Sequence, residues 1–206
     1  MQPQAEVFET PAPSAPEPLP SPQFAIPAAV LLDGIKRVEH AMASDEARPV
    51  LATILLERNA DKLRLITANN YQIAWADLNV DADQFVGPVL IARRDVPLIK
   101  TWLGYKRGQL VAVHFTPETM SLSAGQGTAL TVRLQDGMYP DYIQVIPPKG
   151  GLTVALNADY LATMARSMKG YPILSVYVAG PLSAVLFESV DGGEVIMPIK
   201  TAPAES

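Results

Sequence analysis

One pattern recurs three times along this 206-residue chain, and it constrains the fold more than any other feature. Each copy runs from a short apolar strand through an amphipathic helix to three further strands, and the copies begin near residues 24, 88 and 152, about 64 residues apart. A single βαβββ unit leaves one sheet edge and one helix face uncovered. We therefore expect the first two units to pair as one domain and the third to remain a half-domain that needs a partner.

Apolar residues at helical spacing predict one helix in each copy, over residues 27–43, 93–105 and 157–170. Pro27 and Pro97 suit first helical turns, and Asp95 and Asn157 suit N-caps. The expected buried positions are Val30, Leu31, Ile35, Val38 and Met42 in the first helix, and Tyr160, Leu161 and Met164 in the third.

Short runs rich in β-branched residues and bounded by Gly, Asn, Asp or Pro predict the strands. The leading strands are expected at residues 23–26, 88–92 and 152–156. The strands that follow the helices are expected at residues 50–58, 62–68 and 72–80, at 110–116, 119–125 and 128–134, and at 174–180, 183–189 and 194–200. The predicted fold class is α+β, with repeated βαβββ units whose helices lie on one face of antiparallel sheets.

Proline concentrates at the N-terminus. Seven of the 19 prolines precede residue 23, in a stretch with three Glu, no Lys or Arg and few large apolar residues. Such a stretch cannot bury enough surface to offset the entropy lost on ordering. We expect a disordered leader over residues 1–23, either without a specific role or as a tether or PxxP-type partner site. The predicted domains are then residues 24–150 and 151–201, followed by a tail at 202–206.

The composition offers little for catalysis or metal binding. Without Cys the chain has no thiol nucleophile and no Cys-ligated metal, and its two His, His40 and His114, fall in different segments. Asp136 and Asp141 stand five residues apart, but both occupy turn-forming sequences, so an acid–base pair is the weaker interpretation. We expect no enzyme activity, no metal site and no cofactor. No apolar run reaches the ~18 residues of a transmembrane helix, so no membrane partner is expected either.

Positive charge concentrates on the predicted helices. The formal net charge is −5, but nine of the 16 basic residues and only four of the 21 acidic residues fall on the three helices and their ends, which gives about +5 there and about −10 elsewhere. These cations are either ordinary solvated helix faces or one basic wall for sequence-independent contact with phosphates. The candidate DNA-facing residues are Lys36, Arg37, Arg93, Arg94, Lys100, Lys106, Arg107, Arg166 and Lys169.

Several motifs resemble the bacterial DNA polymerase III beta subunit family, the sliding clamps. The sequence TVRLQDGMYPDYIQVIP, at residues 131–147, resembles a signature that ends the middle domain of that family. ARPVLATILLE at 47–57 and LRLITANNYQIAWADL at 63–78 are similar to two further family stretches. LNADYLATMARSMK at 156–169 and EVIMPIK at 194–200 are similar to the C-terminal part of a clamp.

The resemblance implies a sliding-clamp fold in a shortened form. Units one and two resemble a whole middle domain and unit three the second half of the third domain, which leaves the first domain and the first half of the third without a counterpart. Family clamps close as rings of six domains around DNA, so one and a half domains imply self-association. The implied function is that of a cytoplasmic processivity factor in DNA replication. It would encircle or embrace duplex DNA and tether a polymerase or other clamp-motif proteins.

The resemblance also implies a hydrophobic pocket for partner peptides. Its matching positions are Arg48, Leu51, Tyr71, Gln72, Ile73, Pro140, Gln144, Val145, Val195, Met197 and Ile199. These residue types suit an apolar cleft with a few polar groups on its rim. Taken alone, Leu51, Ile73, Val145 and Val195 are each more typical of core residues. The acid-Gly-His-Arg run of the family reads Asn-Asn-Tyr-Gln at residues 69–72, so one His and one Arg are lost.

Two other functions remain open. The chain is alternatively a clamp-like binding module without a ring, which captures clamp-binding peptides as a decoy or docks on a full-length clamp. A purely structural α+β protein is the third possibility. A ring predicts self-assembly and DNA binding, a binding module predicts peptide capture without a topological hold on DNA, and a structural protein predicts neither.

Overall fold

The computed structural model describes residues 21–44, 48–81, 83–85, 87–125, 129–146, 151–167, 173–189 and 192–200. The chain divides into two units, Met1–Tyr142 and Ile143–Ser206, and each is described by itself. The predicted domain division at residue 150 stays a prediction. So do the leader and the tail, because residues 1–20 and 201–206 lie outside the described residues.

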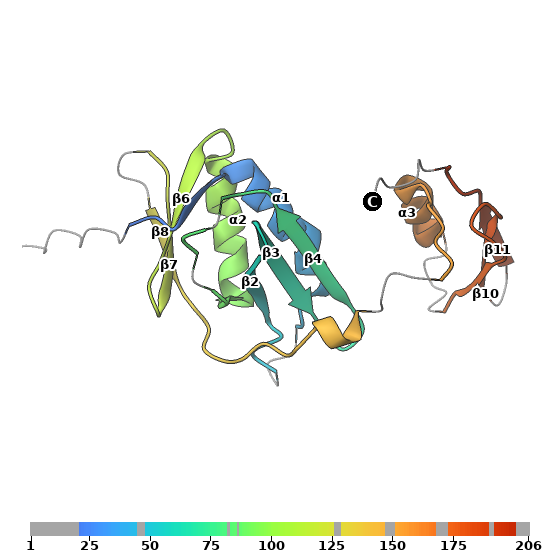
Figure 1. Ribbon diagram of the computed structural model, residues 1–206, viewed down its shortest axis with the longest axis horizontal. Coiled ribbons are helices and arrows are strands. Elements are labelled where there is room, and N and C mark those ends of the chain that lie inside the picture. The colour runs from blue at the N-terminus through green and yellow to red at the C-terminus, as the bar shows by residue number, and fades with distance from the viewer. Residues whose placement is uncertain are drawn as a thin grey trace, which may run out of the picture. The chain divides into compact units, whose positions relative to one another are not determined.

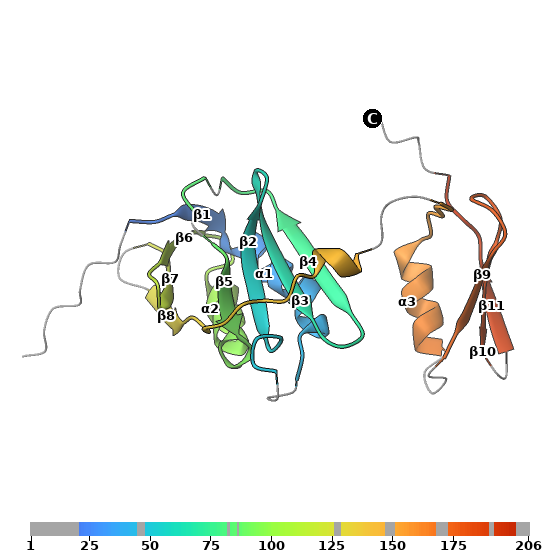
Figure 2. The same cartoon turned by 60° about the horizontal axis from the view of Figure 1, so that its bottom comes forward.

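The described strands of the first unit form two four-stranded antiparallel sheets, one of order β1-β6-β7-β8 and the other of order β4-β3-β2-β5 (Figures 1 and 2). Their bounds agree with the predicted strands to within three residues. The strands are β1 (Phe24–Pro27), β2 (Thr53–Asn59), β3 (Lys62–Ala68), β4 (Ile73–Leu78), β5 (Val89–Ala92), β6 (Leu110–Phe115), β7 (Thr119–Ser123) and β8 (Ala129–Arg133).

The two repeats of this unit exchange their leading strands. β1, from the first repeat, runs antiparallel to β6 of the second, and β5, from the second repeat, runs antiparallel to β2 of the first with Leu90 opposite Leu55. The two sheets meet where Ile91 of β5 forms an isolated bridge with Leu134, just after β8. Each sheet therefore holds three strands of one repeat and one of the other, so the expected pairing of units one and two is confirmed.

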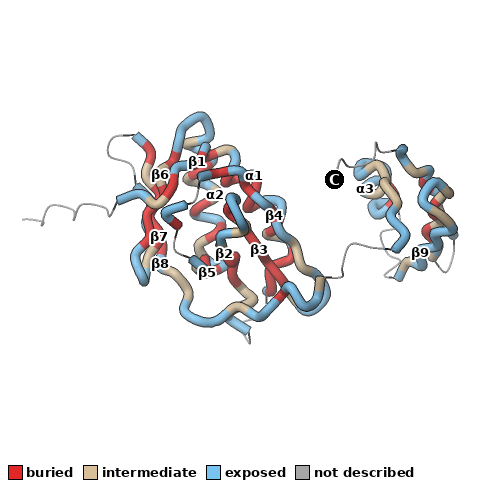
Figure 3. Tube along the Cα trace, viewed as in Figure 1, coloured by how far each residue is buried: buried red, intermediate tan, exposed pale blue. Residues whose placement is uncertain are grey.

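Helices α1 (Ala28–Val38) and α2 (Val96–Tyr105) pack against each other and share one apolar core with both sheets (Figures 1 and 3). α2 follows a 3-10 turn, η2 (Arg93–Asp95), and Asp95 occupies the predicted N-cap position. Pro27 is the N-cap residue of α1 rather than part of its first turn. Val30, which sequence analysis places in the buried stripe, is exposed, and Leu32 is buried instead.

The first helix is also shorter than predicted. α1 ends at Val38 and passes into the 3-10 turn η1 (Glu39–Ala41) instead of continuing to residue 43. The hydroxyl of Thr67 donates a hydrogen bond to the carbonyl oxygen of Val38, and Arg93 Nη1 donates to those of Met42 and Ala43 at 3.0 Å each. Thr67 on β3 thus satisfies a carbonyl at the end of α1, which needs a partner outside the helix, and Arg93 on η2 binds the two carbonyls that follow η1.

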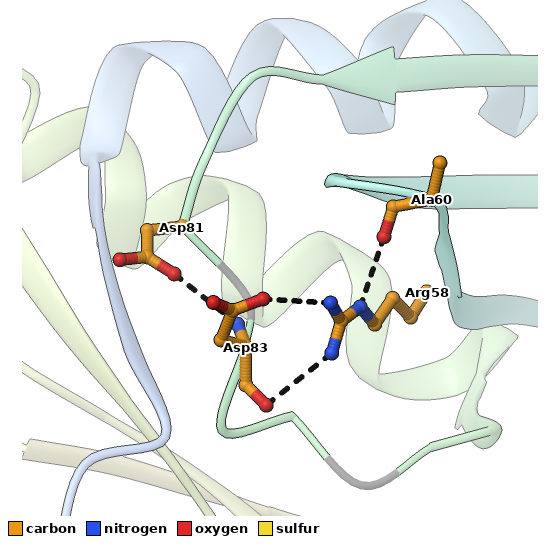
Figure 4. Close-up of polar contacts among 4 residues, drawn as sticks. All are labelled: Arg58, Ala60, Asp81 and Asp83. Atoms are coloured by element: carbon orange, nitrogen blue, oxygen red, sulfur yellow. Dashed lines mark hydrogen bonds and ion pairs between the residues drawn. The ribbon is translucent and has the colours of Figure 1, made fainter.

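Arg58, on β2, fixes the connection between β4 and β5 (Figure 4). Its guanidinium donates to the carbonyl oxygen of Ala60 at 2.9 Å and to the carboxylate of Asp83 at 2.6 Å. The carboxylate of Asp81 accepts a hydrogen bond from the backbone N–H of Asp83 at 3.2 Å. Because this connection leads into β5, the contacts help to place a strand that is exchanged between the repeats.

The second unit holds a single repeat. It contains η3 (Ile143–Val145), α3 (Ala158–Ser167) and an antiparallel sheet of order β11-β10-β9. The strands are β9 (Ser175–Val178), β10 (Val185–Ser189) and β11 (Gly192–Ile196). The predicted N-cap is confirmed, since Asn157 Oδ1 accepts hydrogen bonds from the N–H groups of Asp159 at 2.8 Å and Tyr160 at 3.3 Å. The core is small and consists of Met164, Val185, Phe187 and Ile196 with partly buried neighbours.

Three predictions for the second unit are wrong. Residues 152–156 form no strand, the last strand ends at Ile196 instead of continuing to residue 200, and Tyr160, predicted to be buried, is 62% exposed. In the first unit the other repeat covers both the leading strand and the helix of each repeat. The described residues of the second unit include only one repeat, so the same positions stay uncovered.

Candidate functional site

Three of the predicted peptide-binding residues line one pocket of the first unit. Arg48, Leu51 and Tyr71 border a pocket of about 400 Å³. Arg48 Nη1 donates a hydrogen bond to Asn70 Oδ1 at 2.7 Å, and Tyr71 is 92% exposed. The remaining lining residues are His40, Met42, Ala43, Ser44, Asn69, Asn70 and Arg93. This lining combines the apolar Met42, Ala43 and Leu51 with two arginines and two asparagines, so it offers a peptide both apolar and hydrogen-bonding contacts.

The turn between β3 and β4 shapes one rim of this pocket. Asn69 Oδ1 accepts hydrogen bonds from the N–H groups of Tyr71 at 2.8 Å and Gln72 at 2.9 Å. The N–H of Asn69 donates to the carbonyl oxygen of Gln72 at 3.0 Å. Asp forms the same kind of turn as Asn, so the amide at residue 69 is compatible with the geometry that an acid would give. The turn presents the exposed Tyr71 and Gln72.

Two further predicted residues line a pocket of the second unit. Val195 and Met197, in and just after β11, border a pocket of about 280 Å³ together with Tyr160, Thr163, Glu194 and Ile196. Val195 is 55% exposed and Met197 is 68% exposed, whereas Ile196 between them is buried in the core. This alternation is the one that a strand imposes, and it leaves an apolar side chain on each side of Ile196 for a partner.

The other predicted pocket residues are exposed or half-buried. Pro140, Gln72 and Gln144 are exposed, as are Val145 and Ile199, and Ile73 is half-buried. The alternative that the apolar positions are plain core is therefore wrong for Val145 and Val195. The predicted set is divided between the two units, and a single pocket formed by both groups stays a prediction.

Five candidate DNA-facing cations of the first unit are exposed, and one of them, Arg93, donates to backbone carbonyls. Lys36 and Arg37 lie in the last turn of α1, and Arg94 and Arg107 lie on either side of α2. Arg94 Nε is 3.8 Å from the carboxylate of Asp95, a weak contact on the surface. Cations in the last turn of a helix also interact favourably with the helix dipole, so Lys36 and Arg37 contribute to α1 whether or not they bind a phosphate.

The other candidate cations of the first unit have partners or are half-buried. Lys100 Nζ lies 2.7 Å from both carboxylate oxygens of Glu39, which links α2 to η1. Arg93 donates to the two carbonyl oxygens beyond η1, and Lys106 is half-buried at the end of α2. Lys100 and Arg93 are therefore less available to a phosphate than the other four exposed cations.

In the second unit, Arg166 is exposed on α3, and its Nη2 donates to Thr163 Oγ1 at 3.3 Å. Lys169 lies outside the described residues. A basic wall common to all three helices stays a prediction, since the two units are described separately.

Sequence analysis missed a polar network that anchors the DGMYPDY motif to the sheet. Arg64 on β3 donates to both carboxylate oxygens of Asp77 on β4, at 2.6 and 2.8 Å, and the Tyr142 hydroxyl donates to Glu57 on β2. Hydrogen bonding by Arg64 holds the pKa of Asp77 below its usual value, and burial raises the pKa of Tyr142 and brings that of Tyr139 to about 12. The one available signal was charge pairing across the predicted β3–β4 hairpin.

The described residues include no group of three or more His, Asp or Glu side chains that could hold a metal ion. Asp136 and Asp141 are exposed in the segment after β8. His114 is buried in β6, with Nε2 2.9 Å from Ser123 Oγ, and His40 is exposed beside the first pocket. None of the helices in the described part of the chain is long and apolar enough to cross a membrane.

Comparison with known proteins gives a consistent result. The family model for the central domain of the DNA polymerase III beta subunit matches residues 25–141. The beta sliding clamp of Proteus mirabilis is 24% identical over 139 residues, which cover 68% of this chain and 38% of the relative. The beta sliding clamp of Pseudomonas aeruginosa is 29% identical over 139 residues, which cover 67% of this chain and 37% of the relative. The chain therefore spans less than two fifths of the length of these curated relatives.

Solved structures show the same fold. A sliding clamp from Bartonella birtlesii, bound to griselimycin, superposes with a TM-score of 0.73 at 19% identity, over 93% of this chain and 54% of the other. The clamp from Caulobacter crescentus gives a TM-score of 0.72 at 19% identity, over 91% and 52%. The predicted α+β sliding-clamp fold is confirmed by these superpositions.

Proposed function

This chain belongs to the DNA polymerase III beta subunit family, the sliding clamps, and from that premise we propose that it is a clamp-like processivity factor in DNA replication. In this role it encircles or embraces duplex DNA through basic helices, and it tethers a polymerase or other clamp-motif proteins through a hydrophobic pocket. It acts in the cytoplasm and needs no cofactor. The prediction that the chain is not an enzyme agrees with the family, whose members are non-enzymatic processivity factors.

The observation that carries the DNA role is the packing of α1 against α2 within one unit, with exposed cations in or beside both helices. Cations on a rigid helix pair contact phosphates without reading bases, which is what movement along any sequence requires. Because the net charge is −5, the rest of the chain carries an excess of acidic residues. Those acidic residues repel phosphates, so contact with DNA is confined to the basic helices.

A charge reversal with a matched control tests this role. The double variant Lys36→Glu and Arg37→Glu is expected to bind a fluorescent duplex at low salt about tenfold more weakly than the unmodified chain. The control variant Lys62→Glu and Arg133→Glu changes the net charge equally at two exposed strand positions and is expected to lose much less affinity. Equal losses in both variants would show that only overall charge matters, which contradicts a specific role for α1.

Encircling is tested by DNA topology. A chain that encloses DNA stays on a nicked circular plasmid during gel filtration and slides off once the plasmid is cut. Retention that does not depend on circularity would show that the chain embraces the duplex without closing around it.

The tethering role is tested by a fluorescent clamp-binding peptide. Met197→Asp in the second unit and Leu51→Asp in the first are each expected to abolish binding, because each replaces an apolar contact surface with a charge. Met138→Asp is the matched control, since Met138 is 90% exposed and lines neither pocket. Binding that survives both pocket variants would exclude these pockets as the tether.

A ring-free binding module is the second candidate, and the exposed Val195 and Met197 beside a pocket of the second unit favour it. In that case the chain captures clamp-binding peptides as a decoy or docks on a full-length clamp. The expected result is peptide binding that is sensitive to Met197→Asp, together with no retention on circular DNA.

A further inference from the structure

We propose that two copies of this chain join through their second units, each copy placing residues 152–156 along the free edge of β9 in the other. The inference rests on the self-association that the proposed function requires, and it names the surface and the partner. The result is a complete two-repeat domain assembled from two chains.

The first unit supplies the precedent within the same chain. There, each leading strand pairs with the first strand after the helix of the other repeat, β1 with β6 and β5 with β2. Both β2 and β6 consequently have a neighbour on each side. A βαβββ repeat of this family is thus both a donor of one strand and an acceptor of one strand.

The donor segment of the second unit already lies as β5 does. The N–H of Ile199 donates a hydrogen bond to the carbonyl oxygen of Ala155 at 2.8 Å. In the first unit the N–H of Gln135 donates to the carbonyl oxygen of Leu90 in β5 at 2.9 Å. In both cases the segment after the last strand of the repeat holds one side of the leading segment. The other side of β5 is taken by β2, and the described residues of the second unit contain no equivalent of β2 for residues 152–156.

The acceptor edge is β9, at one end of the β11-β10-β9 sheet. Val176 and Val178 lie opposite Phe187 and Val185, which are buried, so both valines face the core side of the sheet. They are nevertheless 54% and 37% exposed. The corresponding core-facing residues of the first unit, Ile54 and Leu56 in β2 and Val111 and Val113 in β6, are at most 2% exposed. The core of the second unit is therefore open at this edge.

Helix α3 of the second unit is also less buried than its counterpart in the first unit. α1 buries six residues against the sheets and α2, whereas α3 buries only Met164. Tyr160 on α3 remains 62% exposed. A second repeat placed as in the first unit would cover α3 with another helix.

The composition of the donor segment and of the β9 edge favours pairing with another strand. Natural edge strands are commonly protected by charged residues or proline. Residues 151–156 and residues 175–178 contain neither. Since one repeat carries one donor and one acceptor, a second copy of the same repeat satisfies both at once through a two-fold interface. In the first unit the equivalent leading strands, β1 and β5, and the equivalent edges, β6 and β2, are already paired with each other.

The absence of Cys in the chain permits a direct experiment on the full-length protein. An antiparallel pairing like that of β5 with β2 brings the start of the donor segment to the end of β9. Two single-cysteine variants, Thr153→Cys in the donor segment and Ala179→Cys just after β9, are prepared separately, one of them labelled with ¹⁵N. Both positions are exposed. After mixing, a short bismaleimide is expected to give a covalent heterodimer between the labelled and unlabelled chains. Replacing the first variant by Thr101→Cys, on the exposed face of α2, is expected to lower the yield at least about tenfold.

Light scattering after gel filtration completes the test. The unmodified chain is expected to run with at least twice its monomer mass of 22.2 kDa, and Val176→Asp combined with Val178→Asp to run as a monomer. A monomeric unmodified chain, or a dimer whose heterodimer yield equals that of the Thr101→Cys control, would overturn the inference even if the chain binds DNA. A dimer with the expected cross-link supports it even if DNA binding fails, so the two proposals are tested separately.

Discussion

Lys100 Nζ lies 2.7 Å from both carboxylate oxygens of Glu39, and this ion pair joins α2 to the turn that ends α1. Both side chains are only 30% exposed, so solvent shields the pair less than it shields a fully exposed one. The carboxylate competes with any phosphate for Lys100. The ion pair with Glu39, on a neighbouring element, therefore lowers the affinity of Lys100 for a phosphate.

Replacing Glu39→Gln is expected to free Lys100 and tighten binding to duplex DNA a few-fold at low salt, with a salt dependence steeper by about one unit of slope. Anisotropy titrations at several salt concentrations measure both quantities. The control Glu118→Gln removes an acid whose contact with Arg133, at 3.7 Å, lies on an exposed strand surface, and it is expected to change affinity less. Equal effects of the two variants would contradict a phosphate site near Lys100.

The turn at Asn69 is expected to depend on the side-chain oxygen of this residue and not on its amide nitrogen. Asn69→Ala removes the acceptor of two backbone N–H groups and should lower the free energy of unfolding by about 1 kcal/mol. Asn69→Asp keeps the acceptor and should stay close to the unmodified chain. Urea denaturation followed by circular dichroism compares the three. Equal losses for Ala and Asp would show that the turn does not depend on this side chain.

Tyr139 is expected to make the chain less stable in alkaline solution. Burial raises its pKa from 10.0 to about 12, so between these values the unfolded chain loses the phenolic proton before the folded chain does. The contribution of Tyr139 to stability is therefore complete below pH 10 and falls as pH rises toward 12. Tyr139→Phe should flatten this part of the curve of unfolding free energy against pH, whereas the control Tyr71→Phe, at a 92% exposed position, should not.

Asp77 is expected to produce the opposite dependence in acid. The hydrogen bonds from Arg64 lower its pKa from 3.8, so the stabilisation is present above pH 3.8 and is lost as pH falls through the lowered value. Asp77→Asn should be less stable at neutral pH and lose less stability on acidification. Thermal unfolding at pH 7 and pH 3 measures the difference. Asp61→Asn, at an exposed hairpin position, serves as the control and should follow the unmodified chain.

The repeat pattern in the sequence was sufficient to predict most of the fold. Alternation and turn residues located the strands of the first unit, because those strands are half-buried in a regular way. The end of α1 was misplaced, because the hydroxyl of Thr67 binds the carbonyl of its last residue, Val38, and Arg93 binds the carbonyls of Met42 and Ala43 beyond η1; both side chains lie far along the chain. No local pattern contains that information.

The candidate sites, too, could be predicted from the sequence only in part. The resemblance assigned Arg48, Leu51, Tyr71, Val195 and Met197 to one peptide pocket, and in the structure the first three line a pocket of the first unit and the last two a pocket of the second. Charge counting on helices proposed Lys100 as a DNA contact but could not show that Glu39 already binds it. Burial was overestimated in the third repeat. Apolar periodicity shows which side chains are suited to be buried, but it does not show whether another element is present to cover them.

The strand exchange in the first unit also sets an order for folding during synthesis. β1 is among the earliest folded residues to leave the ribosome, yet its partner β6 follows more than 80 residues later. Until β6 has emerged, β1 has no strand to pair with and the sheet of the first repeat lacks β5 as well. The first repeat must therefore wait, with its apolar strands exposed to chaperones and to other nascent chains, until the second repeat is made.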